Sequence, residues 1–385
     1  MTDEIAMIKE SALSNIDLNN IADNSVVCLM APTASGKTAL AYELYDSGRY
    51  EIVSVDSALI YRDMNIGTAK PTAEELERYP HHLVDIIDPT ESYSVAEFVR
   101  DVEYLVQEIH GRGKIPLLVG GTMMYYMALF EGLSNVPESD AAVRAEVEAW
   151  RQADGIEVLH QYLEQIDPAA YARLKPTDTQ RITRAIEVYK QTGRALSDWQ
   201  AEPKNALARS STAQWYGLAV MPDREWLHER IDRRLDIMWE QGLIEEVITL
   251  LQDYPLTPNM AAMRCVGYRQ VLEYLVAVSH PVLSCAHLQK ELFYQTFLDA
   301  DNQAKLATVS PLNHHSDAYK LACLTMRNKA LYATRQLAKR QYTWLRKITK
   351  PPHDFSSNVA SGQNGATVPI FYTFNNIQEI KPYLQ

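Results

Sequence analysis

The sequence is poor in cysteine and has no long apolar run. Its 385 residues contain only four cysteines, which are scattered without a CxxC pair. A disulfide framework and a cysteine-based zinc site are therefore not expected. The polar, acidic start of the chain lacks the apolar core of a signal peptide, and the apolar run of residues 115–129 is too short to span a bilayer. We expect a cytoplasmic protein without a membrane partner.

Positive charge is also scarce. The chain has 37 lysines and arginines against 49 acidic residues, which gives a formal net charge of −12. For the chain as a whole this balance argues against a nucleic-acid partner, because contacts to phosphate depend on lysine and arginine. Residues 324–350 are an exception, since this stretch is rich in lysine and arginine and contains no acidic residue. A basic surface can therefore exist on an acidic protein.

Apolar runs alternate with helix-permissive stretches in the first part of the chain. We expect strands at 26–30, 51–56 and 115–119, and helices at 38–45, 95–109 and 123–130. This alternation predicts an α/β fold of the P-loop NTPase type, in which helices flank a parallel sheet.

Beyond residue 137 the pattern changes to helix after helix, which predicts an inserted all-helical domain. A strand at 215–220 and a helix at 224–240 return the chain to the sheet. The predicted organisation is a polar tail at 1–24, a catalytic core at 25–137, a helical domain at 138–204, a continuation of the core at 205–350 with an insertion at about 278–319, and a peripheral C-terminal tail at 351–385.

A phosphate-binding loop is the clearest motif. It consists of Pro32, Thr33, Ala34, Ser35, Gly36, Lys37 and Thr38, between an expected strand and an expected helix. In such a loop backbone N–H groups surround the anion, the lysine adds a point charge, and the hydroxyl that follows it can coordinate Mg²⁺. Ala31 stands where the strict motif has glycine, which requires a backbone φ at residue 31 that tolerates a Cβ atom.

Two further strand ends carry polar groups. Asp56 follows the second strand, and Gly120-Gly121-Thr122 follows the third. In an open α/β sheet ligands bind beyond the carboxyl ends of strands, so both segments are expected beside the phosphate loop. Asp56 would place a carboxylate beside that loop, or it could hold Mg²⁺ or cap a helix. The Gly120-Gly121-Thr122 segment could offer N–H donors and a hydroxyl, or it could be a plain tight turn.

These features fit a small-molecule kinase, a regulatory GTP-binding module, or an enzyme whose leaving group is a bound diphosphate. The GTP-binding module is disfavoured because the sequence has no NKxD base-recognition motif. A kinase would leave two features without a role. One is the basic stretch near the C-terminus, and the other is Gln180-Arg181-Ile182-Thr183-Arg184, where two arginines share one helical face.

Seven segments together resemble the tRNA dimethylallyltransferase (tRNA isopentenyltransferase) family. They are VSVDSALIYRDMNIGTAKP at 53–71, PTASGKTALA at 32–41, YPHHLVDIIDP at 79–89, IPLLVGGTMMYYMALFEGL at 115–133, QRITRAIEVY at 180–189, RCVGYRQ at 264–270 and ATRQLAKRQYTWLR at 333–346. The resemblance implies transfer of a dimethylallyl group from dimethylallyl diphosphate to N6 of the adenosine 3′ to the anticodon of tRNA, with release of diphosphate. It also implies Mg²⁺ as cofactor, the anticodon stem-loop as partner and a helical domain that binds tRNA. We expect a monomer.

The resemblance also implies roles for individual residues. Asp56 and Thr122 would be catalytic, with Asp56 taking the N6 proton, and Thr38 would hold the metal. The diphosphate would be bound by Pro32, Thr33, Ala34, Ser35, Gly36, Lys37, Thr38 and Arg230. Contacts to tRNA would come from Asp56, Ser57, Ala58, Leu59, Thr122, Arg144, Gln180, Arg181, Ile182, Thr183, Arg184, Arg264, Cys265, Val266, Gly267, Tyr268 and Arg269.

Other residues have two interpretations that the sequence leaves open. Arg335, Lys339 and Arg346 could follow the tRNA backbone or form a solvated helix face. A base can be reached by flipping it out of a loop and stacking it on an aromatic ring, but most aromatic residues are core residues. The aromatic candidates are Tyr125, Tyr126, Tyr268 and Trp344.

Overall fold

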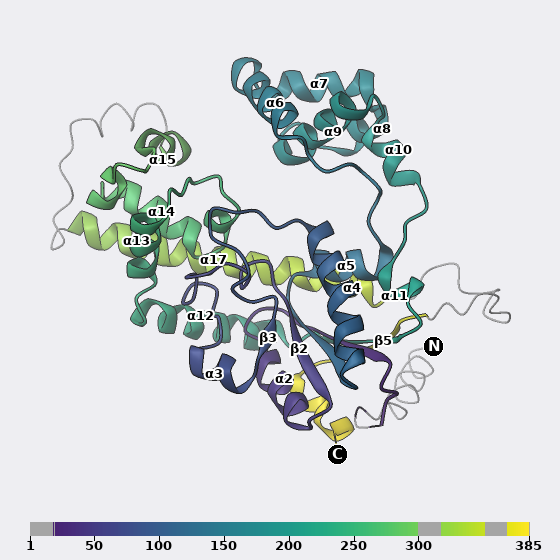
Figure 1. Ribbon diagram of the computed structural model, residues 1–385. Coiled ribbons are helices and arrows are strands. Elements are labelled where there is room, and N and C mark those ends of the chain that lie inside the picture. Colours follow the sequence, from purple (N-terminus) through teal and green to yellow (C-terminus); the bar gives the residue numbers. More distant parts are fainter. Residues whose placement is uncertain (1–17, 19, 299–316, 351–367, 385) are drawn as a thin grey trace. The chain divides into compact units, whose positions relative to one another are not determined.

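The computed structural model describes residue 18 and residues 20–298, 317–350 and 368–384 (Figure 1). Most of the predicted N-terminal tail, residues 299–316 of the predicted insertion and residues 351–367 lie outside the described residues. The chain divides into two compact units, one made of Met1–Phe130 with Leu207–Gln385 and the other of Glu131–Ala206. The two units are described separately below.

The first unit is built on a six-stranded sheet. Its strands are β1 (Ser25–Met30), β2 (Tyr50–Val55), β3 (His81–His82), β4 (Ile115–Gly120), β5 (Gln214–Val220) and β6 (Ile370–Phe374), in the order β3-β2-β4-β1-β5-β6. Every neighbouring pair is parallel. The predicted α/β fold with a parallel sheet flanked by helices is therefore confirmed.

Helices cover both faces of this sheet. In β1 the side chains of Val26, Cys28 and Met30 belong to a core with α4 (Val95–Gly111) and α5 (Met123–Glu131). The intervening Val27 and Leu29 pack with α2 (Lys37–Asp46). Because alternate residues of a strand face opposite sides, the continuous apolar run of β1 is buried on both faces, as expected for a central parallel strand.

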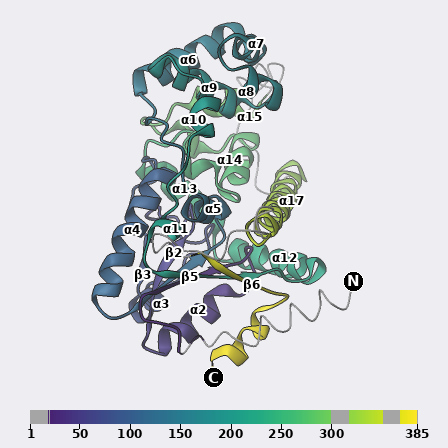
Figure 2. The ribbon, with the colours of Figure 1, turned by 90° about the vertical axis from the view of Figure 1, so that its right-hand side faces the viewer.

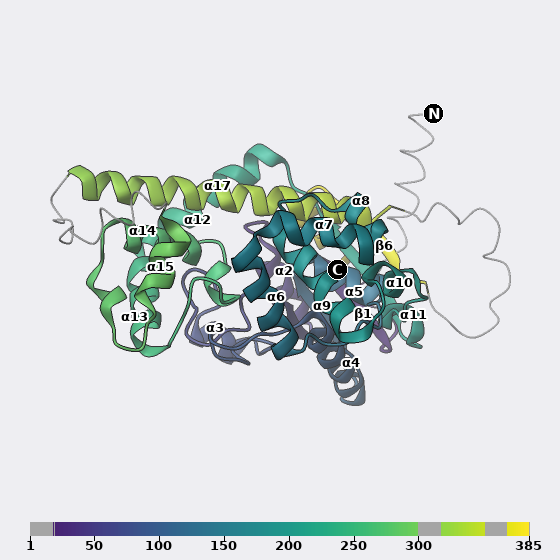
Figure 3. The ribbon, with the colours of Figure 1, turned by 90° about the horizontal axis from the view of Figure 1, so that it is seen from above.

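A third core lies in the helical part of the first unit. It joins α13 (Leu243–Asp253), α14 (Tyr268–Ala277), α15 (Lys290–Phe297) and the long α17 (Asp317–Ile348). Figure 3 shows α17 running beside α14 and α12 (Arg224–Glu240), which both contact it. Val282, Leu288 and Phe293 are buried in this core, so the described beginning of the predicted insertion, residues 278–298, is part of the packed fold.

The remaining short elements of the first unit join these layers. They are α3 (Ala73–Arg78), α11 (Leu207–Ser210), η1 (Ala262–Arg264), η2 (Pro281–Ser284), η3 (Ile377–Glu379) and η4 (Lys381–Leu384). Among the described residues, no helix is long and apolar enough to cross a membrane.

The second unit is all-helical. It contains α6 (Ala141–Asp154), α7 (Ile156–Ile166), α8 (Pro168–Arg173), α9 (Thr179–Thr192) and α10 (Leu196–Ala201). Leu159, Leu163, Ile182 and Ile186 form the centre of its core. The helical domain predicted at 138–204 lies within this unit.

The two ends of the chain differ from the predicted peripheral tails. Residues 370–374 extend the sheet as β6 beside β5 (Figure 2). The IFYTF run of this strand is rich in aromatic and β-branched residues, and its pairing removes β5 from the edge of the sheet. Near the other end Leu18 is fully buried, and its carbonyl accepts a hydrogen bond from the Tyr50 hydroxyl at 2.5 Å. The predicted tails are therefore wrong for these described segments.

Candidate functional site

Three neighbouring strands end at the same level of the sheet. In the register, Met30 of β1 and Val55 of β2 are both paired with Gly120 of β4. The loops that follow are tied together by hydrogen bonds, since Ala31 N–H donates to Gly120 C=O at 3.3 Å and Thr122 N–H donates to Val55 C=O at 3.2 Å. The phosphate loop, the Asp56 loop and the Gly121-Thr122 turn therefore meet at one edge of the sheet, as the sequence predicts.

The phosphate loop leads directly into α2. Ala34 has a φ of 62° and Gly36 a φ of 91°, and Gly36 is the residue immediately before the helix. Ala31 is fully buried with a negative φ, so its Cβ atom causes no strain at the position where the strict motif has glycine. The loop and the first N–H groups of α2 form a site suited to an anion.

Two arginines of α12 join Lys37 at this loop. Arg230 Nε–H donates to Ala34 C=O at 2.8 Å, and the guanidinium lies 4.8 Å from the centre of the Trp226 ring. Burial lowers the pKa of Lys37 to about 8, while Asp56 opposes this shift and Arg234 adds to it. Burial also lowers the pKa of Arg234, opposed by Asp56. Three cations and one carboxylate are thus close enough to influence one another.

Arg234 was not among the site residues predicted from the sequence. It lies four residues after Arg230 and therefore on the same face of α12. This spacing within HERIDRR was the signal that could have identified it. Arg233, by contrast, is 74% exposed and pairs with Glu229 within the helix.

Asp56 is held at the end of β2 by the loop that it begins. Its Oδ1 accepts a hydrogen bond from Ala58 N–H at 2.9 Å, and Thr122 Oγ1 accepts one from Ser57 N–H at 3.0 Å. Asp56 also contributes to raising the pKa of the Cys265 thiol to about 12, where burial is the main cause. The Asp56 loop, Thr122 and the segment that starts at Arg264 therefore lie together.

Two of the predicted tRNA-contact residues in the first unit, Tyr268 and Arg269, make contacts within the protein. Tyr268 is fully buried, and its hydroxyl donates to Glu246 Oε1 at 2.6 Å. Arg269 donates to Pro258 C=O at 3.0 Å and lies over the Phe297 ring. Arg264, at the beginning of the segment, is exposed.

The aromatic candidates for base stacking divide in the same way. Tyr125 and Tyr126 are buried in the core, and the Tyr126 hydroxyl is shared between the carbonyls of Leu29 and Leu118. Trp344 on α17 is 39% exposed, with the Lys347 ammonium 5.4 Å from the centre of its ring. Trp344 is therefore the one of the four candidates with an accessible ring.

The second unit carries the other predicted tRNA-binding residues. Arg144 on α6 is exposed, as are Gln180 and Arg181 on α9. Ile182 is fully buried, and Arg184 Nη2 donates to Pro137 C=O at 2.6 Å. Within this unit Arg144, Gln180 and Arg181 therefore have accessible side chains, whereas Ile182 lies in the core and the half-buried Arg184 contacts the backbone of the same unit.

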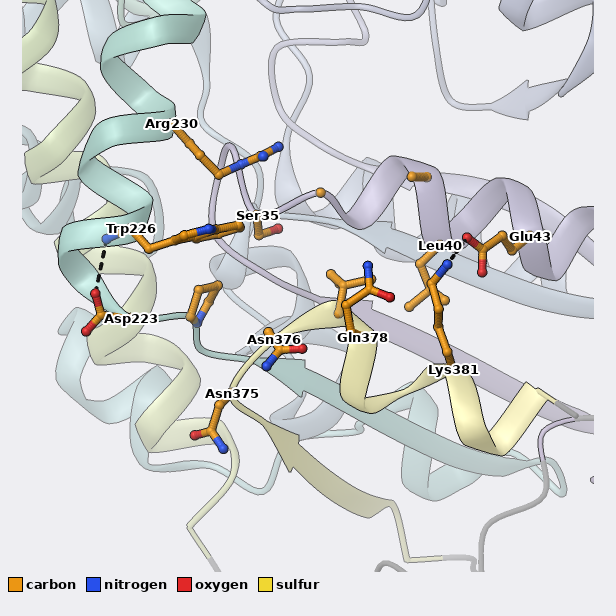
Figure 4. A pocket seen from close by; sticks show the side chains of 14 residues that line it. Ser35, Leu40, Glu43, Asp223, Trp226, Arg230, Asn375, Asn376, Gln378 and Lys381 are labelled. Atoms are coloured by element: carbon orange, nitrogen blue, oxygen red, sulfur yellow. Dashed lines mark hydrogen bonds and ion pairs between the residues drawn. The ribbon is translucent and has the colours of Figure 1, made fainter.

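A pocket of about 720 Å³ lies beside the phosphate loop. Ser35 and Gly36 border it, and Figure 4 shows Trp226 and Arg230 projecting from α12 toward Ser35. Asn376 and Gln378 line another side, so the segment that follows β6 contributes to this pocket.

Comparison with known proteins shows a consistent group of relatives. A family model described as IPP transferase matches residues 59–348. The tRNA dimethylallyltransferase of Psychrobacter sp. (strain PRwf-1) is 57% identical over 373 residues, covering 97% of this chain and 98% of the relative. The tRNA dimethylallyltransferase of Psychrobacter arcticus is 63% identical over 353 residues, covering 89% and 85%.

Solved structures agree with these relatives. The tRNA isopentenylpyrophosphate transferase of Bacillus halodurans is 28% identical, with a TM-score of 0.51 and 94% coverage of both chains. A eukaryotic dimethylallyltransferase acting on tRNA, 24% identical with a TM-score of 0.62, covers 83% of this chain and 69% of its own and supports the fold. The family resemblance drawn from the motifs is therefore confirmed, and the chain belongs to the IPP transferase family, together with the tRNA dimethylallyltransferases.

Proposed function

We propose that this chain transfers the dimethylallyl group of dimethylallyl diphosphate to N6 of the adenosine 3′ to the anticodon in tRNA and releases diphosphate. The observation that carries the proposal is geometric: the phosphate loop, with Lys37 and the Arg230 that bonds to it, meets the Asp56 loop where three strands end. The cations suit a diphosphate, and the carboxylate suits a proton acceptor. Membership of the family, with relatives that are tRNA dimethylallyltransferases, supports the same reaction.

The diphosphate would occupy the phosphate loop. Lys37, the N–H groups at the start of α2 and the guanidinium of Arg234 offer positive charge and hydrogen bonds to the oxygens that gain negative charge as the C–O bond breaks. With a pKa of about 8, Lys37 is mostly protonated at neutral pH. Arg230 fixes the loop through the Ala34 carbonyl and adds its own charge.

The Thr38 hydroxyl, on the first turn of α2, fits a Mg²⁺ ion. Among the described residues, no group of three or more histidine, cysteine or acidic side chains could hold a metal ion. A site with few protein ligands suits Mg²⁺, which is commonly bound by one or two protein oxygens, phosphate oxygens and water. When bound, the ion would neutralise charge on the departing diphosphate.

Asp56 would accept the proton of the attacking amine. The lone pair of adenine N6 is delocalised into the ring, so the amine needs a base as its bond to carbon forms. Asp56 is oriented by Ala58 N–H, and its loop is tied to Thr122 through Ser57. Thr122 would contact the accepting nucleotide beside this carboxylate.

Exposed cations would bind the phosphate backbone of the anticodon stem-loop, and its single-stranded loop would allow the accepting base to flip out. Lys339 and Arg346 on α17, Arg264 near the Asp56 loop, and Arg144 and Arg181 in the second unit are exposed. Such side chains suit a phosphate backbone. Flipping a base out of a single-stranded loop costs less free energy than flipping one out of a duplex.

We propose that the chain acts as a monomer. Measurement of its molecular mass in solution tests this proposal.

The direct test is transfer of the labelled dimethylallyl group of dimethylallyl diphosphate to an unmodified anticodon stem-loop in the presence of Mg²⁺. We expect label in the RNA, and none in a matched stem-loop with guanosine in place of the accepting adenosine. A parallel reaction with ATP and small alcohols tests phosphoryl transfer. Phosphorylated alcohol without prenylated RNA would overturn the proposal in favour of a kinase.

A further inference from the structure

A buried glutamine of α17 joins two of the loops at the candidate site. Gln341 is 7% exposed. Its Oε1 accepts a hydrogen bond from Thr33 N–H in the phosphate loop at 3.1 Å. Its Nε2 donates to Gly121 C=O, in the turn that carries Thr122, at 2.8 Å. One carboxamide therefore connects the expected diphosphate site to the turn beside the expected accepting nucleotide.

The chemistry of this link is specific to an amide. Oε1 must accept and Nε2 must donate at the same time, which neither an ionised carboxylate nor an apolar side chain can do. The fit is also close, because a Cβ atom placed on Gly121 would lie 2.6 Å from Gln341 Nε2. Gly121 thus allows the amide to reach the backbone of the turn.

The residues around Gln341 hold the same loop. Ala338 and Tyr342 pack in one cluster with Ala34, and the Tyr342 hydroxyl donates to Pro222 C=O. Ala34 has a φ of 62°, a conformation that a non-glycine residue keeps only where its surroundings impose it. This part of α17 therefore fixes the conformation of the phosphate loop.

We propose that Gln341 is a positioning residue for prenyl transfer. It holds the phosphate loop at a fixed place relative to the Gly121-Thr122 turn, and so sets the position of the reactive carbon relative to the accepting amine. The inference rests on the proposed function. It predicts a defect in the chemical step rather than in the binding of either substrate, because each half of the site keeps its own ligand groups.

The test compares Gln341→Met, which has similar volume but makes neither hydrogen bond, with Gln336→Met, a matched change at a half-buried glutamine of the same helix. At saturating dimethylallyl diphosphate and tRNA we expect the single-turnover rate of Gln341→Met to fall about 10- to 100-fold, while affinity for inorganic diphosphate changes by less than about 3-fold. Gln336→Met should retain the wild-type rate. A wild-type rate for Gln341→Met at saturation would overturn the proposal, even if its diphosphate affinity fell.

A second variant separates positioning from a purely structural role. In Gln341→Glu the ionised carboxylate cannot donate to Gly121 C=O, but the protonated acid can donate and accept as the amide does. The ratio of its rate to the wild-type rate should therefore rise as the pH is lowered from about 8 to about 5.5, while the ratio for Gln336→Glu should stay flat. A flat ratio for Gln341→Glu would overturn the proposal. If the wild-type protein transferred no dimethylallyl group to tRNA, that result would instead overturn the proposed function.

Discussion

The cations at the edge of the sheet and the cations on α17 have different surroundings. Lys37 and Arg234 are partly buried, and burial lowers the pKa of each. Lys339 and Arg346 on α17 are exposed. A partly buried cation interacts strongly with a bound anion because little water screens it, whereas an exposed one acts mainly by releasing counterions. The first group therefore suits one small diphosphate, and the second suits a long phosphate backbone.

Substitution of Asp56 should have the largest effect on the reaction rate, because Asp56 is the carboxylate that lies with the partly buried cations Lys37 and Arg234. Asp56→Asn keeps the shape of the side chain but cannot accept a proton, so single-turnover prenyl transfer should fall by on the order of 10²–10⁴-fold at saturating substrates and Mg²⁺. Binding of tRNA should persist. A wild-type chemical rate would remove Asp56 as the base, and recovery at high Mg²⁺ would reassign it to the metal.

Substitution of Lys37 tests directly whether the partly buried cations bind the diphosphate. Lys37→Ala should weaken binding of diphosphate and lower kcat/KM by on the order of 10²-fold or more, because the variant loses a positive charge of the phosphate loop that would stabilise the departing diphosphate. The unfolding temperature should change little, which thermal unfolding by circular dichroism would check. Unchanged kinetics would refute a phosphate site at this loop.

The pKa of Lys37 adds a pH dependence that the exposed cations do not share. Burial lowers this pKa to about 8, so the ammonium is charged below that pH and loses its proton as the pH rises through it. Diphosphate affinity should therefore decrease between about pH 7 and 9 in the wild-type protein, with a much weaker change in Lys37→Ala. Calorimetric titration with inorganic diphosphate across this range measures both, and parallel profiles would contradict the assignment.

Substitution of Arg234 tests whether this arginine contributes to diphosphate binding, and Arg233 on the same helix provides a matched control. Arg234→Ala should weaken diphosphate binding by about 10-fold, because one charge of the cluster is lost. Arg233→Ala should leave it unchanged, since Arg233 is 74% exposed and pairs with Glu229. Equal effects of the two substitutions would show that general charge, rather than this cluster, attracts the diphosphate.

The site residues that could be predicted are determined by residues close to them in sequence, whereas those that were missed depend on contacts between residues far apart in sequence. The phosphate loop and Asp56 each follow directly from an apolar strand, so their placement depends on a few neighbouring residues and on the common direction of parallel strands. Gln341, by contrast, contacts Thr33, which is 308 residues away in sequence. The pairing of β6 with β5 is a contact of the same kind. Gln341 lies within the family segment 333–346, but the residues near it in sequence do not indicate that it contacts the phosphate loop.

Burial was the other property that the sequence could not supply. Tyr268 and Trp344 are both aromatic residues within family segments, yet Tyr268 is fully buried and Trp344 is 39% exposed. The difference comes from the packing of α14 and α17, which brings together residues from several helices. Residue type alone therefore could not separate a candidate stacking ring from a core ring.

The exposed cations of α17 give the smallest expected effect, and it should appear in salt dependence rather than in chemistry. Replacing Lys339 and Arg346 by alanine should weaken tRNA binding and reduce the slope of log affinity against log salt concentration by about 1 or slightly less for each lost phosphate contact. Lys329→Ala is the control, because Lys329 pairs with Glu273. Filter binding at several salt concentrations measures the slope. An unchanged slope would mean that these cations form a solvated face. Of the two groups of cations, only the partly buried Lys37 and Arg234 would then have an assigned ligand, the diphosphate.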